Sequence, residues 1–102
     1  MPTYITLIRF TQKGVEAIRE APARLDAAKQ TYAAVGAKLK AFYLVTGRYD
    51  AVAIAEAPDD ETMAKISLAI ASKGNSRTET VRAFGEDEYR KIVKDLPEVK
   101  IR

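Results

Sequence analysis

The stretch Lys38–Glu56, KLKAFYLVTGRYDAVAIAE, contains two apolar runs separated by a glycine and an arginine. Both runs, Lys38–Thr46 and Tyr49–Glu56, are rich in aromatic and aliphatic residues, which favour strands. Gly47-Arg48 fits a two-residue loop with glycine first, the pattern of a type II′ turn. The stretch therefore predicts an antiparallel hairpin, which sets the direction of two neighbouring strands in a sheet.

The turn also predicts which hairpin residues share a face, because side chains alternate along each strand. One predicted face carries the side chains of Thr46, Tyr49, Leu44, Ala51, Phe42 and Ala53. The opposite face carries those of Val45, Asp50, Tyr43, Val52, Ala41, Ile54 and Leu39. Neither face is polar along its length, so both should be covered.

The rest of the chain extends this hairpin in both directions. Before it, Thr3–Phe10 reads as a strand, and Thr11 then caps a helix that Pro22 kinks or splits and Gly36 ends. After it come a helix capped by Pro58-Asp59 and ended by Gly74-Asn75, a strand over Arg77–Phe84, and a helix over Glu86–Leu96.

This order predicts one domain, residues 1–102, of the α+β class. Strand, helix, strand, strand, helix and strand make the ferredoxin-like βαββαβ pattern, here with an extra C-terminal helix. Right-handed crossovers then give a four-stranded antiparallel sheet with two helices on one face. A second copy of the chain, packed sheet against sheet, is the simplest cover for the other face, so we expect a homodimer; the alternative is that the last helix and tail fold under the sheet.

Composition excludes several kinds of chemistry. The 102 residues include no Cys and no His, so disulfides, thiolate metal sites and His-based catalytic triads are absent. The acidic clusters at Asp59–Glu61 and Glu86–Glu88 fall at expected helix starts, where they favour the helix dipole. We therefore expect no metal and no cofactor.

Charge and hydropathy narrow the expected partners and location. The formal net charge is +3, but Lys and Arg are scattered among acids without a basic run, so we expect no nucleic-acid partner. The apolar part of the N-terminus is too short for a signal peptide, and no segment is long enough for a membrane span. We expect a cytoplasmic protein.

Asp50 is the principal site candidate, because a carboxylate stands where a strand becomes apolar. Beside apolar surface it would serve as a base or bind a polar ligand group, with Tyr43 within reach across the hairpin. The alternative is structural: Asp50 accepts hydrogen bonds from the backbone, or from Arg48, Arg77 or Arg9, and locks the hairpin. Arg77 would bind an anionic ligand, or serve only to keep an edge strand from aggregating.

Aromatic residues are numerous for so small a chain. They are candidates to line a pocket for a planar ligand, although such residues also make ordinary cores and interfaces. The aromatic residues in question are Tyr4, Tyr32, Tyr43, Tyr49 and Phe42.

Gly47-Arg48-Tyr49-Asp50, entering an alanine-rich strand, resembles the Gly-x-Tyr-Asp signature of the GYD-domain family. The stretches MPTYITLIRFTQKG, EAPDDET (Glu56–Thr62) and GNSRTETVRAFGEDEY (Gly74–Tyr89) resemble this family as well. The resemblance implies a dimeric α/β barrel related to the ferredoxin-like fold, in a family that is largely uncharacterised, and makes Gly47, Tyr49 and Asp50 its structural motif. It supplies no activity.

The sequence is compatible with three functions. The first is a homodimeric protein that binds a small molecule between helices and sheet, or at the dimer seam near Tyr43, Tyr49, Asp50 and Arg77. The second is a cofactor-independent enzyme, monooxygenase-like or acid–base, that uses Asp50 as its base. The third is an interaction module without a ligand. Assembly beyond the dimer is left open.

Overall fold

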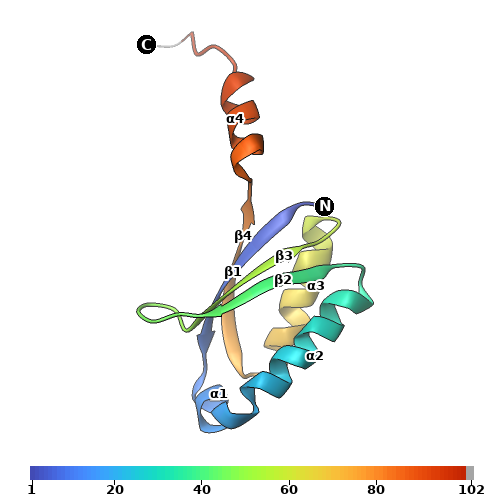
Figure 1. Ribbon diagram of the computed structural model, residues 1–102, viewed down its shortest axis with the longest axis vertical. Coiled ribbons are helices and arrows are strands. Elements are labelled where there is room, and N and C mark those ends of the chain that lie inside the picture. Colours follow the sequence, from blue (N-terminus) through green and yellow to red (C-terminus); the bar gives the residue numbers. More distant parts are fainter. Residues whose placement is uncertain (101–102) are drawn as a thin grey trace.

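Four antiparallel strands form one sheet in the order β2-β3-β1-β4 (Figure 1). The computed structural model describes residues 1–100. Its elements are β1 (Thr3–Phe10), α1 (Gln12–Glu16), the 3-10 helix η1 (Ile18–Glu20), α2 (Ala21–Ala34), β2 (Lys38–Leu44), β3 (Ala51–Glu56), α3 (Asp60–Ala71), β4 (Ser76–Ala83) and α4 (Glu86–Lys94). This confirms the predicted α+β, ferredoxin-like order with an extra C-terminal helix.

The helices divide into a layer and an arm. α2 and α3 pack on one face of the sheet, whereas α4 continues from the end of β4 and projects away from the body (Figure 1). The alternative in which α4 folds under the sheet is therefore wrong for the part of the chain that is described. Within residues 1–100 no helix is long and apolar enough to cross a membrane.

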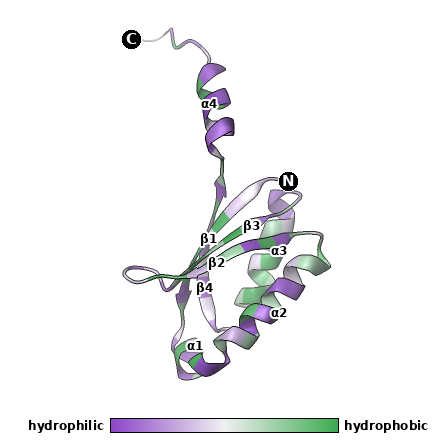
Figure 2. Cartoon of the chain, in the orientation of Figure 1, coloured by the Kyte–Doolittle hydropathy of each residue, from purple (hydrophilic) through white to green (hydrophobic). Residues whose placement is uncertain are grey.

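The core lies between the sheet and the two packed helices. It is built from Tyr4 and Ala55 of the sheet, Tyr32 of α2, and Met63 and Ile66 of α3, all buried. Figure 2 shows hydrophobic residues along the central strands and α3, while α4 is mostly hydrophilic with apolar patches. The core is thus concentrated at the end of the sheet where β3 leads into α3.

The first helical segment is broken, as predicted, but the break comes earlier than Pro22. α1 ends at Glu16, a turn of 3-10 helix follows, and α2 begins at Ala21 with Pro22 as its second residue. Proline is tolerated there because the first-turn N–H groups have no partner inside the helix. Pro22 therefore begins a helix and does not kink one.

The hairpin register near the turn is confirmed. Leu44 faces Ala51 in the ladder, and the Val45 N–H donates to the Asp50 carbonyl at 3.0 Å. Gly47 has a φ of 105°, which a residue with a Cβ rarely adopts. Regular strand ends sooner than predicted, so the loop runs from residue 45 to residue 50.

A bulge in β2 corrects the predicted face of Leu39. The register shifts between Leu39 and Ala41, so Leu39 faces Ala55 and packs on the core instead of lying on the opposite face. Without the shift, Lys40 would occupy that place and its ammonium would be buried at a high cost in free energy. The bulge leaves Lys40 exposed, with its Nζ 4.0 Å from a carboxylate oxygen of Glu56.

The sheet face opposite the helices, here called the open face, carries apolar side chains that one chain leaves partly exposed. Its central residues are Ile5 and Leu7 of β1 and Val52 and Ile54 of β3, each of intermediate exposure. Val81 of β4 pairs with Ile5 and is about half exposed. The prediction that neither face of the sheet is polar holds for this central region.

Candidate functional site

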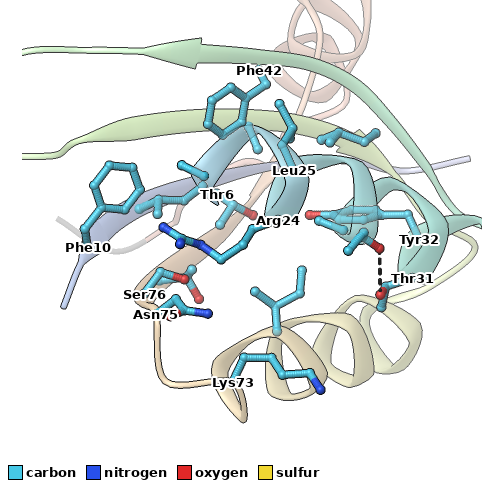
Figure 3. A pocket seen from close by; sticks show the side chains of 18 of the residues that line it. Thr6, Phe10, Arg24, Leu25, Thr31, Tyr32, Phe42, Lys73, Asn75 and Ser76 are labelled. Atoms are coloured by element: carbon cyan, nitrogen blue, oxygen red, sulfur yellow. Dashed lines mark hydrogen bonds between the residues drawn. The ribbon is translucent and has the colours of Figure 1, made fainter. Parts of the chain in front are cut away.

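A cavity of about 650 Å³ lies between α2 and the sheet, beside the core (Figure 3). Residues from all four strands form its floor, and residues from α2 and the end of α3 form its walls. The side chains that line it include Thr6, Ile8, Phe10, Arg24, Leu25, Tyr32, Phe42, Ala53 and Ile70. This volume lies within the range of small-molecule sites in proteins, roughly 300–1,000 Å³.

Alternation along the strands explains the floor of the cavity. Thr6, Ile8 and Phe10 follow one another on the helix-facing side of β1, and Phe42 faces Ala53 across the hairpin. Ala53 is buried yet reaches only one carbon from the backbone. Because this small side chain stands beside large ones, the floor is hollow at its centre.

The wall from α2 is also built from small residues. Ala21, Ala27 and Ala28 line the cavity, beside the larger side chains of Leu25 and Tyr32. Alanine favours the helix itself but fills little space towards the sheet. α2 is therefore a stable helix that leaves the sheet under it partly unfilled.

Tyr32 marks the end of the cavity that adjoins the core. Its side chain is buried, and burial raises the pKa of its phenol above the ordinary value of 10.0. The hydroxyl of the neighbouring Thr6 lies 3.0 Å from that of Thr80, so this end of the cavity is polar but paired. Tyr32 consequently stays neutral under ordinary conditions.

Arg24 marks the opposite end of the cavity. Its Nη1 donates to the carbonyl of Ala17 at 2.9 Å, and its Nη2 donates to the carbonyl of Gly14 at 3.2 Å. These bonds fasten the guanidinium to the segment where α1 meets η1, and Figure 3 shows the side chain lying along the cavity. Within residues 1–100, Arg24 and Lys73 are the charged residues that line the cavity, and no carboxylate does.

Asp50, the principal candidate from the sequence, does not line this cavity. Its Oδ2 accepts a hydrogen bond of 2.8 Å from the N–H of Phe10, and its own N–H donates to the carbonyl of Ile8 at 2.8 Å. The carboxylate is therefore engaged with the backbone of β1. This geometry favours the structural alternative, in which Asp50 locks the hairpin.

Tyr49 lies on the open face, which differs from its predicted position beside Phe42. Its hydroxyl donates to Glu79 at 3.0 Å, and the guanidinium of Arg9 lies 5.0 Å from its ring centre. The strand pairing ends before Tyr49, so alternation does not fix its direction and these two contacts decide it.

Tyr43 and Arg77 are both exposed on the open face and lie outside the cavity. Arg77 shares this face with Glu79, as their spacing predicts, and is the ladder partner of Arg9. The structure thus gathers the predicted residues Tyr43, Tyr49 and Arg77 on one face, while the cavity lies on the other.

Two cavity residues, Phe10 and Arg24, were missed as site candidates. The signal for Phe10 was its alternation with Ile8 on a strand. For Arg24, nothing local to the helix indicates that it turns back to the carbonyls of Gly14 and Ala17. Of the aromatics proposed to line a pocket, Tyr32 and Phe42 line this one, and Tyr4 lies in the core.

Acidic clusters play capping roles where the structure describes them. The Asp59 carboxylate accepts from the N–H of Thr62 at 2.8 Å, and the N–H of Gly85 donates to Glu88 at 3.1 Å. Among residues 1–100 no group of three or more potential ligands is placed to hold a metal ion.

Comparison with known proteins gives matches over most of the chain. The model of the GYD domain matches residues 4–93. A protein of Thermus thermophilus, named glutamine synthetase and cystathionine beta-lyase binding protein, is 37% identical over 85 residues, which are 82% of this chain and 90% of that protein.

Solved structures agree on the fold. TTHA0845 from Thermus thermophilus is 30% identical, with a TM-score of 0.54 over 83% of this chain and 95% of that one. The feast or famine regulatory protein Rv3291c from M. tuberculosis, complexed with L-methionine, has a TM-score of 0.64 at 16% identity over 83% of this chain. The match spans about half, 51%, of the regulatory protein, and at this identity it shows the fold alone.

Proposed function

The chain belongs to the GYD-domain family, and from this premise we propose that it is a homodimeric binding protein that docks onto other proteins. The observation that carries the proposal is apolar surface that one chain leaves uncovered, on the open face and on α4. The relative that is 37% identical supports it, because its name describes a protein that binds two enzymes.

The open face is the proposed dimer interface. Ile5, Leu7, Val52 and Ile54 form a continuous apolar centre across its two middle strands. Packing two such sheets against each other removes this surface from water, which stabilises the pair by roughly 25 cal/mol per Å² of apolar area. A two-fold axis brings the same residues together from both chains.

α4 is the proposed docking element for a partner enzyme. Tyr89, Ile92 and Val93 recur at helical spacing on α4, Leu96 follows just after its last residue, Lys94, and all four side chains are exposed. A helix of nine residues is marginal in water without tertiary contacts. An amphipathic helix that lays its apolar side into a groove is a common mode of protein recognition. Here the groove of the partner would also supply the tertiary contacts that the apolar side of α4 lacks within residues 1–100.

Two measurements test this proposal. Native mass spectrometry should give a mass of two chains; a mass of one chain would contradict the dimer. Immobilised protein should retain purified glutamine synthetase or cystathionine β-lyase of the same organism, and Ile92→Ser should weaken this binding at least tenfold. Lys91→Ser, on the polar side of α4, is the matched control and should bind like the wild type. Equal binding by both variants would exclude α4 as the docking element.

The cavity favours a second candidate function, the binding of a small molecule between α2 and the sheet. It lies on the opposite side of the sheet from the proposed dimer interface, so both functions are compatible in one molecule. Protein purified from cells and sprayed under native conditions should carry a reproducible small adduct if the ligand is held tightly.

A further inference from the structure

We propose that the cavity between α2 and the sheet binds an amphipathic carboxylate, an aliphatic acid of medium chain length, with its carboxylate at Arg24. This inference rests on the small-molecule binding proposed above and names the class of ligand. Three features of the cavity support it: its apolar lining, the sign of its charges, and its length.

The lining of the cavity favours a ligand whose main part is apolar. The aromatic rings of Phe10 and Phe42, with Ile8, Leu25 and Ile70, are among the large apolar side chains that a ligand would touch. The hydroxyl of Thr6 is engaged with that of Thr80, whereas Asn75, Ser76 and Thr78 add a few polar side chains to the lining around the start of β4. A ligand rich in hydroxyl or amide groups would lose its water against this mostly apolar lining and gain few partners, which disfavours sugars and nucleosides.

The charges select an anion. Arg24 and Lys73 both carry positive charge, and no Asp or Glu of the described chain lines the cavity to balance them. An organic cation would therefore meet repulsion, whereas a carboxylate would find a counter-charge beside an apolar surface. Arginine suits this role because its planar guanidinium can donate two parallel hydrogen bonds to one carboxylate.

Arg24 is held in position before any ligand arrives. Its bonds to the carbonyls of Ala17 and Gly14 use two of the five N–H donors of a guanidinium, so donors remain for a ligand. Fixing the side chain in advance reduces the entropy lost when a ligand binds. The same bonds keep the charge at one end of the cavity.

The distance along α2 sets the length of the ligand. Arg24 lies near one end of the cavity and Tyr32 at the other, eight residues later on the same helix, or about 12 Å along its axis. The core closes the far end at Tyr32. A straight-chain acid with its carboxylate at Arg24 would therefore extend along the helix until Tyr32 stops it.

Calorimetry with a chain-length series tests the inference on the wild-type protein. Hexanoate, octanoate and decanoate should bind with one site per chain, and affinity should rise about fourfold for each added methylene. Decanoate should bind at least tenfold more tightly than decanol, which has the same chain without the charge. This comparison needs no variant, so it stands even if a substitution unfolds the protein.

A pair of variants locates the charge. Arg24→Gln should bring decanoate down to the affinity of decanol and leave decanol unchanged. Lys29→Gln removes a positive charge from the exposed side of the same helix, outside the cavity, and should bind decanoate like the wild type. Equal losses in both variants would indicate a general effect of charge and overturn the role of Arg24.

Two results on the wild type would overturn the inference. They differ in whether the proposed small-molecule function also fails. If acid and alcohol bind equally well, the carboxylate class is wrong while small-molecule binding stands. If no acid or alcohol of the series binds and the adduct in native mass spectrometry is also missing, the small-molecule function itself fails.

Discussion

The carboxylate of Asp50 accepts a hydrogen bond of 2.8 Å from the backbone N–H of Phe10, a residue forty positions earlier in the chain. Asp50 also donates its own N–H to the carbonyl of Ile8 at 2.8 Å. The ladder between β1 and β3 ends with Ile8 facing Ala51, so Asp50 fastens the hairpin loop to β1 just beyond the last pair.

This relationship predicts a stability effect at Asp50. Asp50→Ala leaves the Phe10 N–H without its partner and should lower the free energy of unfolding by about 1–2 kcal/mol. Asp50→Asn keeps an acceptor oxygen and should lose less. Urea unfolding measures both, with Asp26→Ala, at an exposed position on α2, as the control. An Asp50→Ala variant as stable as this control would contradict the structural role.

Substitution on the open face should separate the proposed dimer. Ile5 lies at its centre, paired with Ile54 and Val81, so Ile5→Glu would bury a carboxylate in the interface. Size-exclusion chromatography with light scattering should give a mass of one chain for this variant and of two for the wild type. Leu68→Glu, on the exposed side of α3, is the control and should stay dimeric.

Alkaline pH should weaken the fold through Tyr32. Burial raises the pKa of this phenol in the folded chain above its value in the unfolded chain, so the folded state holds the proton more tightly. Its contribution to stability is complete below about pH 10 and is lost as pH rises through the raised pKa. Urea unfolding between pH 8 and 11, as an experimental range, measures this effect. The free energy of unfolding should change less with pH for Tyr32→Phe than for the wild type.

Acid should weaken the cap of α3. The hydrogen bond from the backbone N–H of Thr62 lowers the pKa of the Asp59 carboxyl below its ordinary value of 3.8. The contribution of Asp59 is therefore complete above that value and is lost as pH falls through the lowered pKa. Asp59→Asn retains a capping oxygen without the titration, so its melting temperature should fall less between pH 5 and pH 2.5. If the melting temperatures of the wild type and Asp59→Asn fall equally in acid, titration of Asp59 does not cause the loss of stability.

The parts of the fold that were predictable are those decided by local chemistry. Glycine before arginine in the turn predicts the pairing of Leu44 with Ala51, which the structure confirms. Asp59 and Thr11 cap helices as their side-chain oxygens favour, by accepting the N–H groups of Thr62 and Gly14. Such signals depend on a few neighbouring residues and need no knowledge of the whole molecule.

The parts that were not predictable depend on contacts between distant segments. Strict alternation places Lys40 towards the core, and only the unfavourable burial of its charge indicates a bulge. Tyr49 turns to Arg9 and Glu79, which lie on two other strands. The cavity depends on how far α2 stands from the sheet, and the alternation of apolar residues along the strands does not encode that distance.

Consecutive side chains of β1 lie in two separate compartments. Thr6 and Ile8 line the cavity, whereas Ile5 and Leu7 lie on the open face. β1 thus separates the cavity from the open face. A single inserted residue would move each set of side chains to the other side of the sheet. A deep mutational scan scored separately for ligand retention and for assembly should show tolerance that alternates along β1, with opposite phase in the two assays.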